Sequence, residues 1–503
     1  MTTQTGLNHY QRGLELATAG RHQEGLHCIR EHLRLAPNDP QALNDAGAIL
    51  HCLGQTEDAI GCLIKARSVK ADSAEIVWNL VEAYLAGGRA AEAVALFDSM
   101  EQLGILSIDV LNRTATLLLD QGRAGLAIDV LLRSRRLWPE QEVLTPMLEV
   151  IRSKRPKVAF FRAGAGGDGV LAEICEFVQE RFQTEYYQGL GLVSESDASH
   201  DAMASLLRWS DIAWFDGGGP MAVEASRLRG DARIVVSVRR SDLCDRWAKD
   251  VRWENVSILV QIGSSAVEEV LVEQVPDIHN RTRLVVVPNG VNLERYALRR
   301  RERGKNLACI GCLTMQANPA FLVQCMQKLH YLDPGYRLSF AGSFESPILE
   351  QYVRHMVRTL DLTDVITFEP SYGELNGWLS DKHYIVACGI GEDQIEALLA
   401  GMACGLKPIV HNFPGADKLF PPKHLFNIAE QFCEHVLARE YEPEQYRRFV
   451  EQRYPLDQQL NRVNGILQQI ETEIESRPGR VAGEVSCEVS TRRSPRETRR
   501  ATP

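Results

Sequence analysis

A glycine-containing turn between an apolar strand and a helix is the part of this sequence best suited to chemistry. The strand at 384–387 leads into Gly-Ile-Gly-Glu at 389–392, and a helix-favouring run follows over 393–403. At such a turn several backbone N–H groups point from the positive end of the helix dipole, which favours phosphate binding. The carboxylate of Glu392 can accept hydrogen bonds from sugar hydroxyl groups. The pattern alone is equally typical of an ordinary strand–turn–helix unit.

Two motifs around this turn resemble those of one enzyme family. The first, at 402–416, contains Met-Ala-Cys-Gly-Leu-Lys-Pro and His-Asn-Phe-Pro-Gly-Ala. The second, at 285–296, reads Val-Val-Val-Pro-Asn-Gly-Val-Asn and then Leu-Glu-Arg-Tyr. In this order and spacing they resemble the family 4 glycosyltransferases, whose GT-B fold has two facing Rossmann-like α/β domains. The resemblance covers roughly 157–474 and implies a nucleotide-sugar donor bound by the second domain.

The resemblance also assigns roles to individual residues. Glu392 and Arg239 are the candidate catalytic residues. Relatives have a histidine where this chain has Arg239, and an arginine can pair with a phosphate but cannot act as a base. The predicted donor-binding residues are Gly311, Asn318, Asp393, Gln394, Ile395, Glu396 and Lys407.

Several positions depart from the family pattern. The stretch 311–319 holds neither the arginine nor the lysine that relatives direct at the departing diphosphate. Ala400 replaces their second glutamate, and Asp393 brings negative charge to a position that faces phosphate in relatives. Three interpretations therefore stay open. The protein is an active retaining glycosyltransferase in which Arg239 or Lys407 supplies the missing charge, a catalytically impaired GT-B adaptor, or another GT-B enzyme such as an epimerase.

A first α/β domain is expected upstream of these motifs. A short strand at 157–161 precedes a glycine-rich segment at 164–169 and a helix at 170–182. Strands alternating with helices predict a parallel sheet covered on both faces, with ligands bound at the carboxyl ends of its strands. Further strands are predicted at 212–215, 234–238 and 258–262. The acceptor-side candidates that this rule places around one cleft are Gly166, Gly167, Asp168, Asp216 and Gly217.

The second α/β domain is predicted from a similar alternation. Its strands are expected at 307–311, 337–341, 365–368, 384–387 and 407–411, and its helices include 319–332 and 347–360. A long helical stretch at 444–474 should break or kink at Pro455. The resemblance implies that this last helix crosses back onto the first domain.

The N-terminal third is periodic. Gly20, Gly54, Gly88 and Gly122 recur every 34 residues, followed at fixed offsets by small and then bulky apolar residues. A unit of this length and pattern predicts tetratricopeptide repeats, here over about 8–139 with a capping helix at 140–151. The concave face of such a solenoid suits a protein or peptide partner. Dimerisation through the repeats is the alternative.

Composition agrees with this division. The 503 residues are 45% hydrophobic with a net charge of −10, which argues against a nucleic-acid binder. Twelve scattered cysteines favour reduced thiols and a cytoplasmic location. We expect no cofactor and no metal, because the chain contains no Asp-x-Asp motif. The predicted domains are the repeats at 1–151, the two GT-B domains at 157–290 and 291–475, and an arginine-rich tail at 476–503 that is expected to be disordered. Two interpretations of the tail stay open: a solvated segment, or weak peripheral contact with a membrane through anionic lipid head groups.

Overall fold

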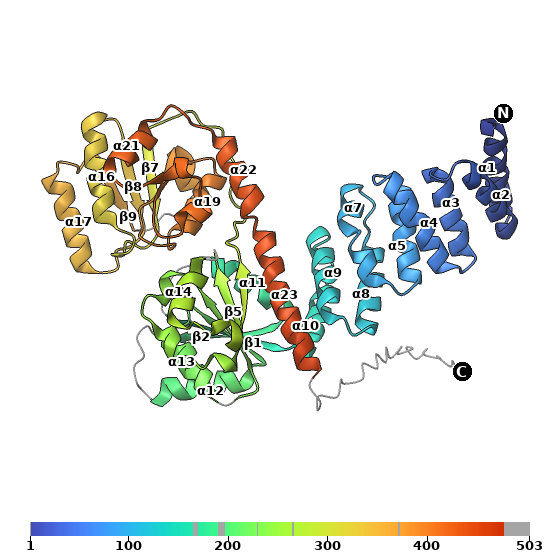
Figure 1. The fold of residues 1–503 in the computed structure, drawn as a ribbon, viewed down its shortest axis with the longest axis horizontal. Helices are drawn as coiled ribbons and strands as arrows, with labels where there is room; N and C mark the ends of the chain where they lie inside the picture. Colours follow the sequence, from blue (N-terminus) through green and yellow to red (C-terminus); the bar gives the residue numbers. More distant parts are fainter. Residues whose placement is uncertain are drawn as a thin grey trace, which may run out of the picture.

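The computed structural model describes residues 2–163, 170–189, 197–228, 230–263, 266–370 and 373–476. A helical solenoid comes first and is followed by two α/β domains, each built on a parallel sheet (Figure 1). The fold class is therefore the predicted one, α-helical repeats followed by two Rossmann-like domains.

The solenoid consists of paired helices and one final single helix. The first helices of the four pairs are α1 (Thr2–Thr18), α3 (Pro40–Cys52), α5 (Ala74–Ala86) and α8 (Ile108–Asp120). Their partners are α2 (His22–Leu35), α4 (Thr56–Val69), α6 (Ala90–Val94) with α7 (Phe97–Gln102), and α9 (Ala124–Leu137). The second helix of the third pair is thus interrupted, which the periodicity did not predict. The final helix, α10 (Leu144–Lys154), begins four residues later than predicted.

The periodic glycines end the first helix of each pair. Gly54 has a φ of 74°, a conformation that costs glycine little, and the next residue, Gln55, donates its N–H to the carbonyl of Leu50 at 2.9 Å. Gly20, Gly88 and Gly122 have φ angles of 78°, 70° and 72°. The 34-residue period therefore reflects one helix-ending turn repeated four times.

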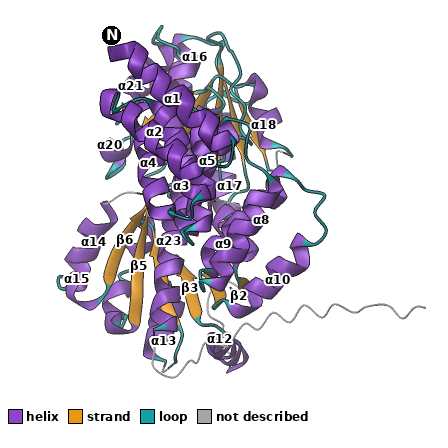
Figure 2. Ribbon diagram, turned by 90° about the vertical axis from the view of Figure 1, so that its right-hand side faces the viewer, coloured by secondary structure: helices purple, strands orange, loops and turns teal. Residues whose placement is uncertain are grey.

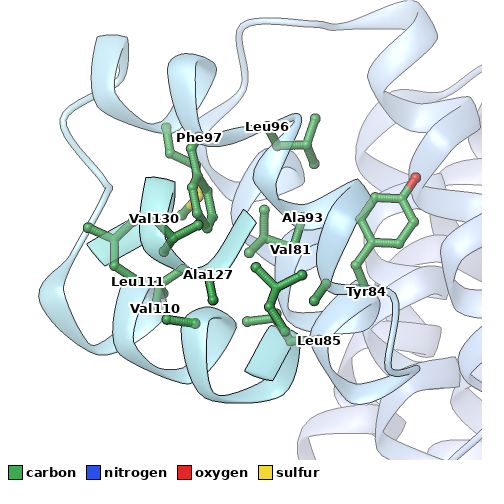
Figure 3. Close-up of a cluster of buried hydrophobic side chains, with 14 of the residues drawn as sticks. Val81, Tyr84, Leu85, Ala93, Leu96, Phe97, Val110, Leu111, Ala127 and Val130 are labelled. Atoms are coloured by element: carbon green, nitrogen blue, oxygen red, sulfur yellow. The ribbon is translucent and has the colours of Figure 1, made fainter. Parts of the chain in front are cut away.

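Small residues let the paired helices approach closely. Ala93 and Ala127 are fully buried at the positions that the repeat pattern reserves for small side chains. Around them Phe97, Val110 and Leu111 form a continuous core shared by neighbouring pairs (Figure 3). No pair buries its apolar face alone, as expected for a solenoid.

The first α/β domain has a sheet in the order β2-β1-β3-β4-β5-β6, with every pairing parallel. Its strands are β1 (Lys157–Ala163), β2 (Gln183–Gly189), β3 (Ile212–Asp216), β4 (Arg233–Val238), β5 (Val256–Ile262) and β6 (Arg283–Val287). Its α-helices are α11 (Val170–Arg181), α12 (Asp197–Trp209), α13 (Gly219–Arg227), α14 (Ala266–Gln274) and α15 (Ile278–Arg281). Buried apolar clusters cover both faces of the sheet.

The second α/β domain repeats this architecture. Its parallel sheet has the order β12-β11-β10-β7-β8-β9. The strands are β7 (Asn306–Ile310), β8 (Arg337–Ala341), β9 (Ile366–Glu369), β10 (Tyr384–Ala387), β11 (Lys407–His411) and β12 (Leu425–Phe426). The α-helices are α16 (Pro319–Leu332), α17 (Pro347–Thr359), α18 (Leu375–Trp378), α19 (Ile395–Ala403), α20 (Ala416–Leu419) and α21 (Ala429–Leu437).

Two chain segments that connect the domains lie side by side. Val291 donates its N–H to the carbonyl of Tyr454 at 2.9 Å and accepts one from Leu456 at 3.1 Å. Pro455 separates α22 (Pro443–Arg453) from α23 (Leu456–Glu475), because a proline cannot continue a helix from its preceding turn. Helix α23 then packs on the first domain, where its apolar residues join the core beneath β5 and β6 (Figures 1 and 2).

The solenoid is docked onto the first α/β domain through α9, α10, α11 and α23. Arg155, which follows α10, makes a two-pronged pair with Glu471 of α23 at 2.9 and 2.8 Å. Its guanidinium also stacks on Phe182, 3.8 Å from the ring centre. Arg181 of α11 pairs with Asp129 of α9 at 2.7 Å. None of the described helices is long and apolar enough to cross a lipid bilayer.

Candidate functional site

The carboxyl ends of strands from both sheets meet between the two α/β domains, and side chains from each domain touch there. Arg239, just after β4, pairs with Glu396 of α19 at 3.1 Å. Ser241 donates a hydrogen bond to Asp393 at 3.1 Å, and Lys418 pairs with Glu269. We call this region the interdomain site and define it by Asp216, Arg239, Ser241, Asp242, Gly263, Asn289, Glu392, Asp393 and Glu396.

Arg239 lies among carboxylates of both domains. Burial lowers the pKa of Arg239, but the nearby charges of Asp216, Glu396 and Asp242 outweigh it and raise that pKa overall. The guanidinium is therefore firmly cationic, and its side chain stays 25% exposed. Asp216 Oδ2 also lies 3.9 Å from Nε of Arg162 in β1. The interdomain site thus interleaves carboxylates with guanidinium groups.

The acidic residues of the first domain are held in place by hydrogen bonds. Ser237 accepts a hydrogen bond from the indole N–H of Trp214 at 2.9 Å and donates one to Asp216 at 3.0 Å. Asp242 accepts the backbone N–H of Arg239 at 2.7 Å. Burial raises the pKa of Asp242 to about 6, and the charges of Asp216 and Asp393 add to the rise, whereas the contacts with Arg239 oppose it.

Glu392 reaches across to the first domain. Only 5% of this residue is exposed. A methyl group built on Gly263, at the end of β5, would lie 2.9 Å from Glu392 Oε2 and 3.3 Å from Asn289 Nδ2. Gly263 has a φ of 99°, so both its conformation and its lack of a side chain make room for Glu392. The predicted carboxylate is therefore at the domain interface, beside the Pro-Asn-Gly-Val motif.

The glycine turn differs from the predicted phosphate site. The side-chain oxygen of Gln394 accepts the backbone N–H groups of Cys388 and Gly389, each at 3.0 Å, and its amide nitrogen donates to Cys309 Sγ at 3.4 Å. The N–H of Ile390 bonds to the carbonyl of Gln316 at 2.9 Å. These three backbone N–H groups already have acceptors within the protein, so they are not available to bind a phosphate. Helix α19 begins at 395, two residues later than predicted.

The remaining residues that were predicted to bind the donor lie in separate places. Gly311, with a φ of 125°, and Asn318, with a φ of 53°, shape the backbone between β7 and α16. Ile395 is buried in the apolar core, so its side chain cannot contact a ligand. Lys407 is the first residue of β11, so it lies at the amino-terminal ends of the strands, away from the interdomain site. There its side chain donates a hydrogen bond to the carbonyl of Glu440 at 2.9 Å. Burial lowers the pKa of Lys407 to about 8.

The acceptor-side predictions are only partly described. Asp216 belongs to the interdomain site, and Gly217 follows it with a φ of 82°. Gly166, Gly167 and Asp168 lie outside the residues that the structure describes. Among the described residues, no group of three or more His, Cys, Asp or Glu side chains could hold a metal ion.

Four residues of the interdomain site were absent from the predicted site residues, and one of them, Asn289, was noted only as part of the Pro-Asn-Gly-Val motif. Ser241 and Asp242 follow Arg239 immediately, and an Arg-Arg-Ser-Asp run after a strand could have been recognised as a polar loop at a carboxyl end. Gly263 directly follows β5, but nothing in its neighbouring sequence indicates a contact with Glu392. A groove of about 660 Å³ lies elsewhere, over β5 and β6, and none of the predicted site residues lines it.

Comparisons with known proteins support the two-part architecture. The tetratricopeptide repeat family profile matches residues 52–105, and no curated protein sequence matches the chain. Anabaena HepE in complex with UDP and glucose is 12% identical and aligns over 62% of this chain and 100% of its own, with a TM-score of 0.51. Sucrose-phosphate synthase from Thermosynechococcus elongatus is 13% identical over 63% of this chain and 100% of its own, with a TM-score of 0.50.

A third structure aligns with a larger share of the chain at a lower TM-score. A mutant of the O-GlcNAc transferase from Thermobaculum terrenum is 12% identical and covers 94% of this chain and 98% of its own, with a TM-score of 0.42. The similarity to HepE and sucrose-phosphate synthase is at the level of the fold, and the two parallel sheets and returning helix of this chain agree with it. The chain is a tetratricopeptide-repeat solenoid fused to a two-domain unit of the GT-B fold.

Proposed function

We propose that the protein is a glycosyltransferase that moves a sugar from a nucleotide-sugar donor to an acceptor. The observation that carries this proposal is the interdomain site, where Arg239 of one domain and Glu392 of the other lie at the facing carboxyl ends of two parallel sheets. Ligands of open α/β sheets bind at such ends. A site formed by two domains can also close around its substrate and exclude water.

The two residues have different roles in this proposal. The Glu392 carboxylate would accept hydrogen bonds from hydroxyl groups of the donor sugar. Arg239 would pair with the diphosphate as the bond between the anomeric carbon and the phosphate oxygen breaks, because charged hydrogen bonds to phosphate are strong. Asp216 and Gly217 would face the acceptor. We further propose retention of the anomeric configuration and independence from metal ions, both of which rest on the family 4 resemblance.

Those two finer points have direct tests. We expect the product to keep the anomeric configuration of the donor when followed by proton NMR during the reaction. We expect EDTA to leave the initial rate unchanged. Inversion of the anomeric centre would contradict the first point, and a loss of rate that Mg²⁺ or Mn²⁺ restores would contradict the second.

We propose that the repeats recruit a protein or peptide acceptor. A polar stripe joins α3 and α5, the first helices of the second and third pairs: Asn79 bonds to Asn44 at 3.0 Å, and Asn44 bonds to Glu75 at 3.1 Å. Helices α1, α3, α5 and α8 carry six carboxylates and two arginines between them. Such a stripe favours an extended acceptor segment that contains lysine or arginine.

Charge reversal on this stripe tests the recruiting role. Glu75→Lys should raise KM for a protein acceptor severalfold while hydrolysis of the donor stays unchanged. Asp58→Lys, an equally exposed change on the second helix of its pair, is the matched control. Equal effects of the two variants on KM would contradict recruitment by the stripe.

A second candidate function is supported by the glycine turn. The side-chain oxygen of Gln394 already accepts hydrogen bonds from two backbone N–H groups of the turn. The stretch 311–319 has neither an arginine nor a lysine. Both features weaken the attraction for a diphosphate. They favour a GT-B unit that has lost catalysis and serves as an adaptor bearing repeats.

Calorimetry with a panel of nucleoside diphosphates and their sugars separates the two candidates. We expect weak but measurable binding of UDP or GDP, abolished by Arg239→Ala and unchanged by EDTA. Absence of heat with every nucleotide at millimolar concentration would favour the adaptor. Micromolar binding that survives Arg239→Ala would assign the diphosphate to another cation.

A further inference from the structure

The ion pair between Arg239 and Glu396 occupies the guanidinium to which the proposed function assigns the diphosphate. Glu396 Oε1 lies 3.1 Å from Arg239 Nη2. Glu396 is on the first turn of α19, where the helix dipole favours a negative charge. A phosphate would be attracted by the same two features, the helix start and the guanidinium. The Glu396 carboxylate therefore lies in the position where an anionic ligand would be attracted most strongly.

The same pair also connects the two domains. Two further contacts connect the same domains: the hydrogen bond from Ser241 to Asp393 and the ion pair between Lys418 and Glu269. The chain itself crosses between the domains at the paired connecting segments, where Val291 bonds to Tyr454 and Leu456. Two domains joined at such a connection can rotate about it, and side-chain contacts between the domains then favour the closed arrangement.

We propose that Glu396 is an internal competitor of the donor diphosphate. In the ligand-free protein it holds Arg239 and keeps the domains together, and nucleotide binding must displace it from the guanidinium. This inference rests on the proposed function and adds a regulatory role for a residue of the same site. It would account for the weak nucleotide binding that we expect despite a well-placed arginine.

The displacement lowers affinity because one anion replaces another. Side chains of Arg239 and Glu396 are 25% and 32% exposed, so water screens part of their attraction. Asp216 and Asp242 remain beside the guanidinium after Glu396 leaves, and they limit the gain from its removal. We therefore expect Glu396→Gln to tighten nucleotide binding about three- to tenfold rather than by orders of magnitude.

The test is calorimetry with UDP and GDP on the full-length protein. Glu396→Gln should bind about three- to tenfold more tightly than the unchanged protein. Glu269→Gln is the matched control, because it removes a different ion pair between the domains, with Lys418, and leaves Arg239 untouched. In an Arg239→Ala background, in which nucleotide binding is expected to be lost, Glu396→Gln should not restore it, since the two residues act through one contact; restored binding would contradict the competitor role.

Small-angle scattering of the ligand-free protein gives a readout that needs no nucleotide. Glu396→Gln, and more strongly Glu396→Ala, should increase the radius of gyration as the domains separate, with thermal unfolding confirming that each variant folds. Nucleotide binding that Glu396→Gln leaves unchanged would overturn the competitor role while the proposed function stands. Absence of binding in every variant, Glu396→Ala included, would overturn both.

Discussion

Substitution of Gly263 by alanine is a sharp test of the interdomain site. The added methyl group would lie 2.9 Å from Glu392 Oε2 and 3.3 Å from Asn289 Nδ2, both closer than ordinary carbon contacts. Because Gly263 has a φ of 99°, alanine would also strain the backbone, which costs about 1–2 kcal/mol. Glu392 must then move, and the movement opens or distorts the interface.

The expected effect on function exceeds the effect on stability. Displacement of a positioning group by about 1 Å can reduce catalysis about 100-fold, and we expect Gly263→Ala to lower kcat/KM by roughly 10- to 100-fold. The free energy of unfolding should fall by only about 1–2 kcal/mol. Steady-state kinetics and chemical denaturation measure the two effects separately. Where turnover is too slow to follow, calorimetric affinity for the nucleotide-sugar replaces kcat/KM.

Two controls isolate the contact from the strain. Gly54→Ala places alanine at a φ of 74° in the repeats, with no atom within 4 Å, and so measures strain without a clash. In a Glu392→Ala background the contacting oxygen is gone, so the further loss caused by Gly263→Ala should shrink. Strictly additive effects of Gly263→Ala and Glu392→Ala, or full activity of Gly263→Ala, would refute the contact between Glu392 and the first domain.

Three further variants probe other parts of the structure. Glu392→Gln should reduce turnover about 10- to 150-fold at nearly constant melting temperature, because hydrogen bonds to a charged group contribute about 1.5–3 kcal/mol; a large drop in melting temperature with unchanged turnover would make Glu392 a structural residue. Asp242→Asn should stabilise the protein by about 1–2 kcal/mol at pH 7.5. The pKa of Asp242 is about 6 in the fold, above its ordinary value of 3.8, so its contribution to stability declines as pH rises from about 4 to about 6; a stabilisation that persists unchanged at pH 4.5 in denaturation curves would contradict this assignment. Glu471→Ala leaves the buried guanidinium of Arg155 without its partner and should cost about 3–5 kcal/mol in denaturation experiments; a cost below about 1 kcal/mol would show that the pair is solvated in solution.

The sequence predicted those parts of the fold that a local pattern determines. The helix-ending glycines recur because each needs a left-handed backbone, and apolar runs marked the central strands of both sheets. Strand β2 (Gln183–Gly189) was missed because it reads Gln-Thr-Glu-Tyr-Tyr-Gln-Gly and lies at an edge of its sheet, where burial does not require an apolar run. The interruption between α6 and α7 likewise has no proline or glycine to announce it.

The candidate site was predictable only as far as strand ends could be located. Arg239 and Glu392 follow strands of different domains, and the rule for parallel sheets places both at the interface. The same rule could have excluded Lys407, because this residue begins its strand instead of ending it. Partners were beyond prediction: 157 positions separate Arg239 from Glu396, and neither residue type alone reveals the other.

The attachment of the repeats determines which of the two α/β domains they would move with. The solenoid is fixed to the first α/β domain by the buried pair of Arg155 and Glu471 and by the pair of Arg181 and Asp129. Helix α23, which carries Glu471, also continues from the connection at Pro455 that joins the second domain. Rotation about this connection would move the second α/β domain while the repeats keep their position relative to the first α/β domain. If the proposed function holds, a segment held by the repeats would therefore keep its position relative to Asp216 while the domains open and close around a nucleotide, which a solenoid attached to the second domain could not provide.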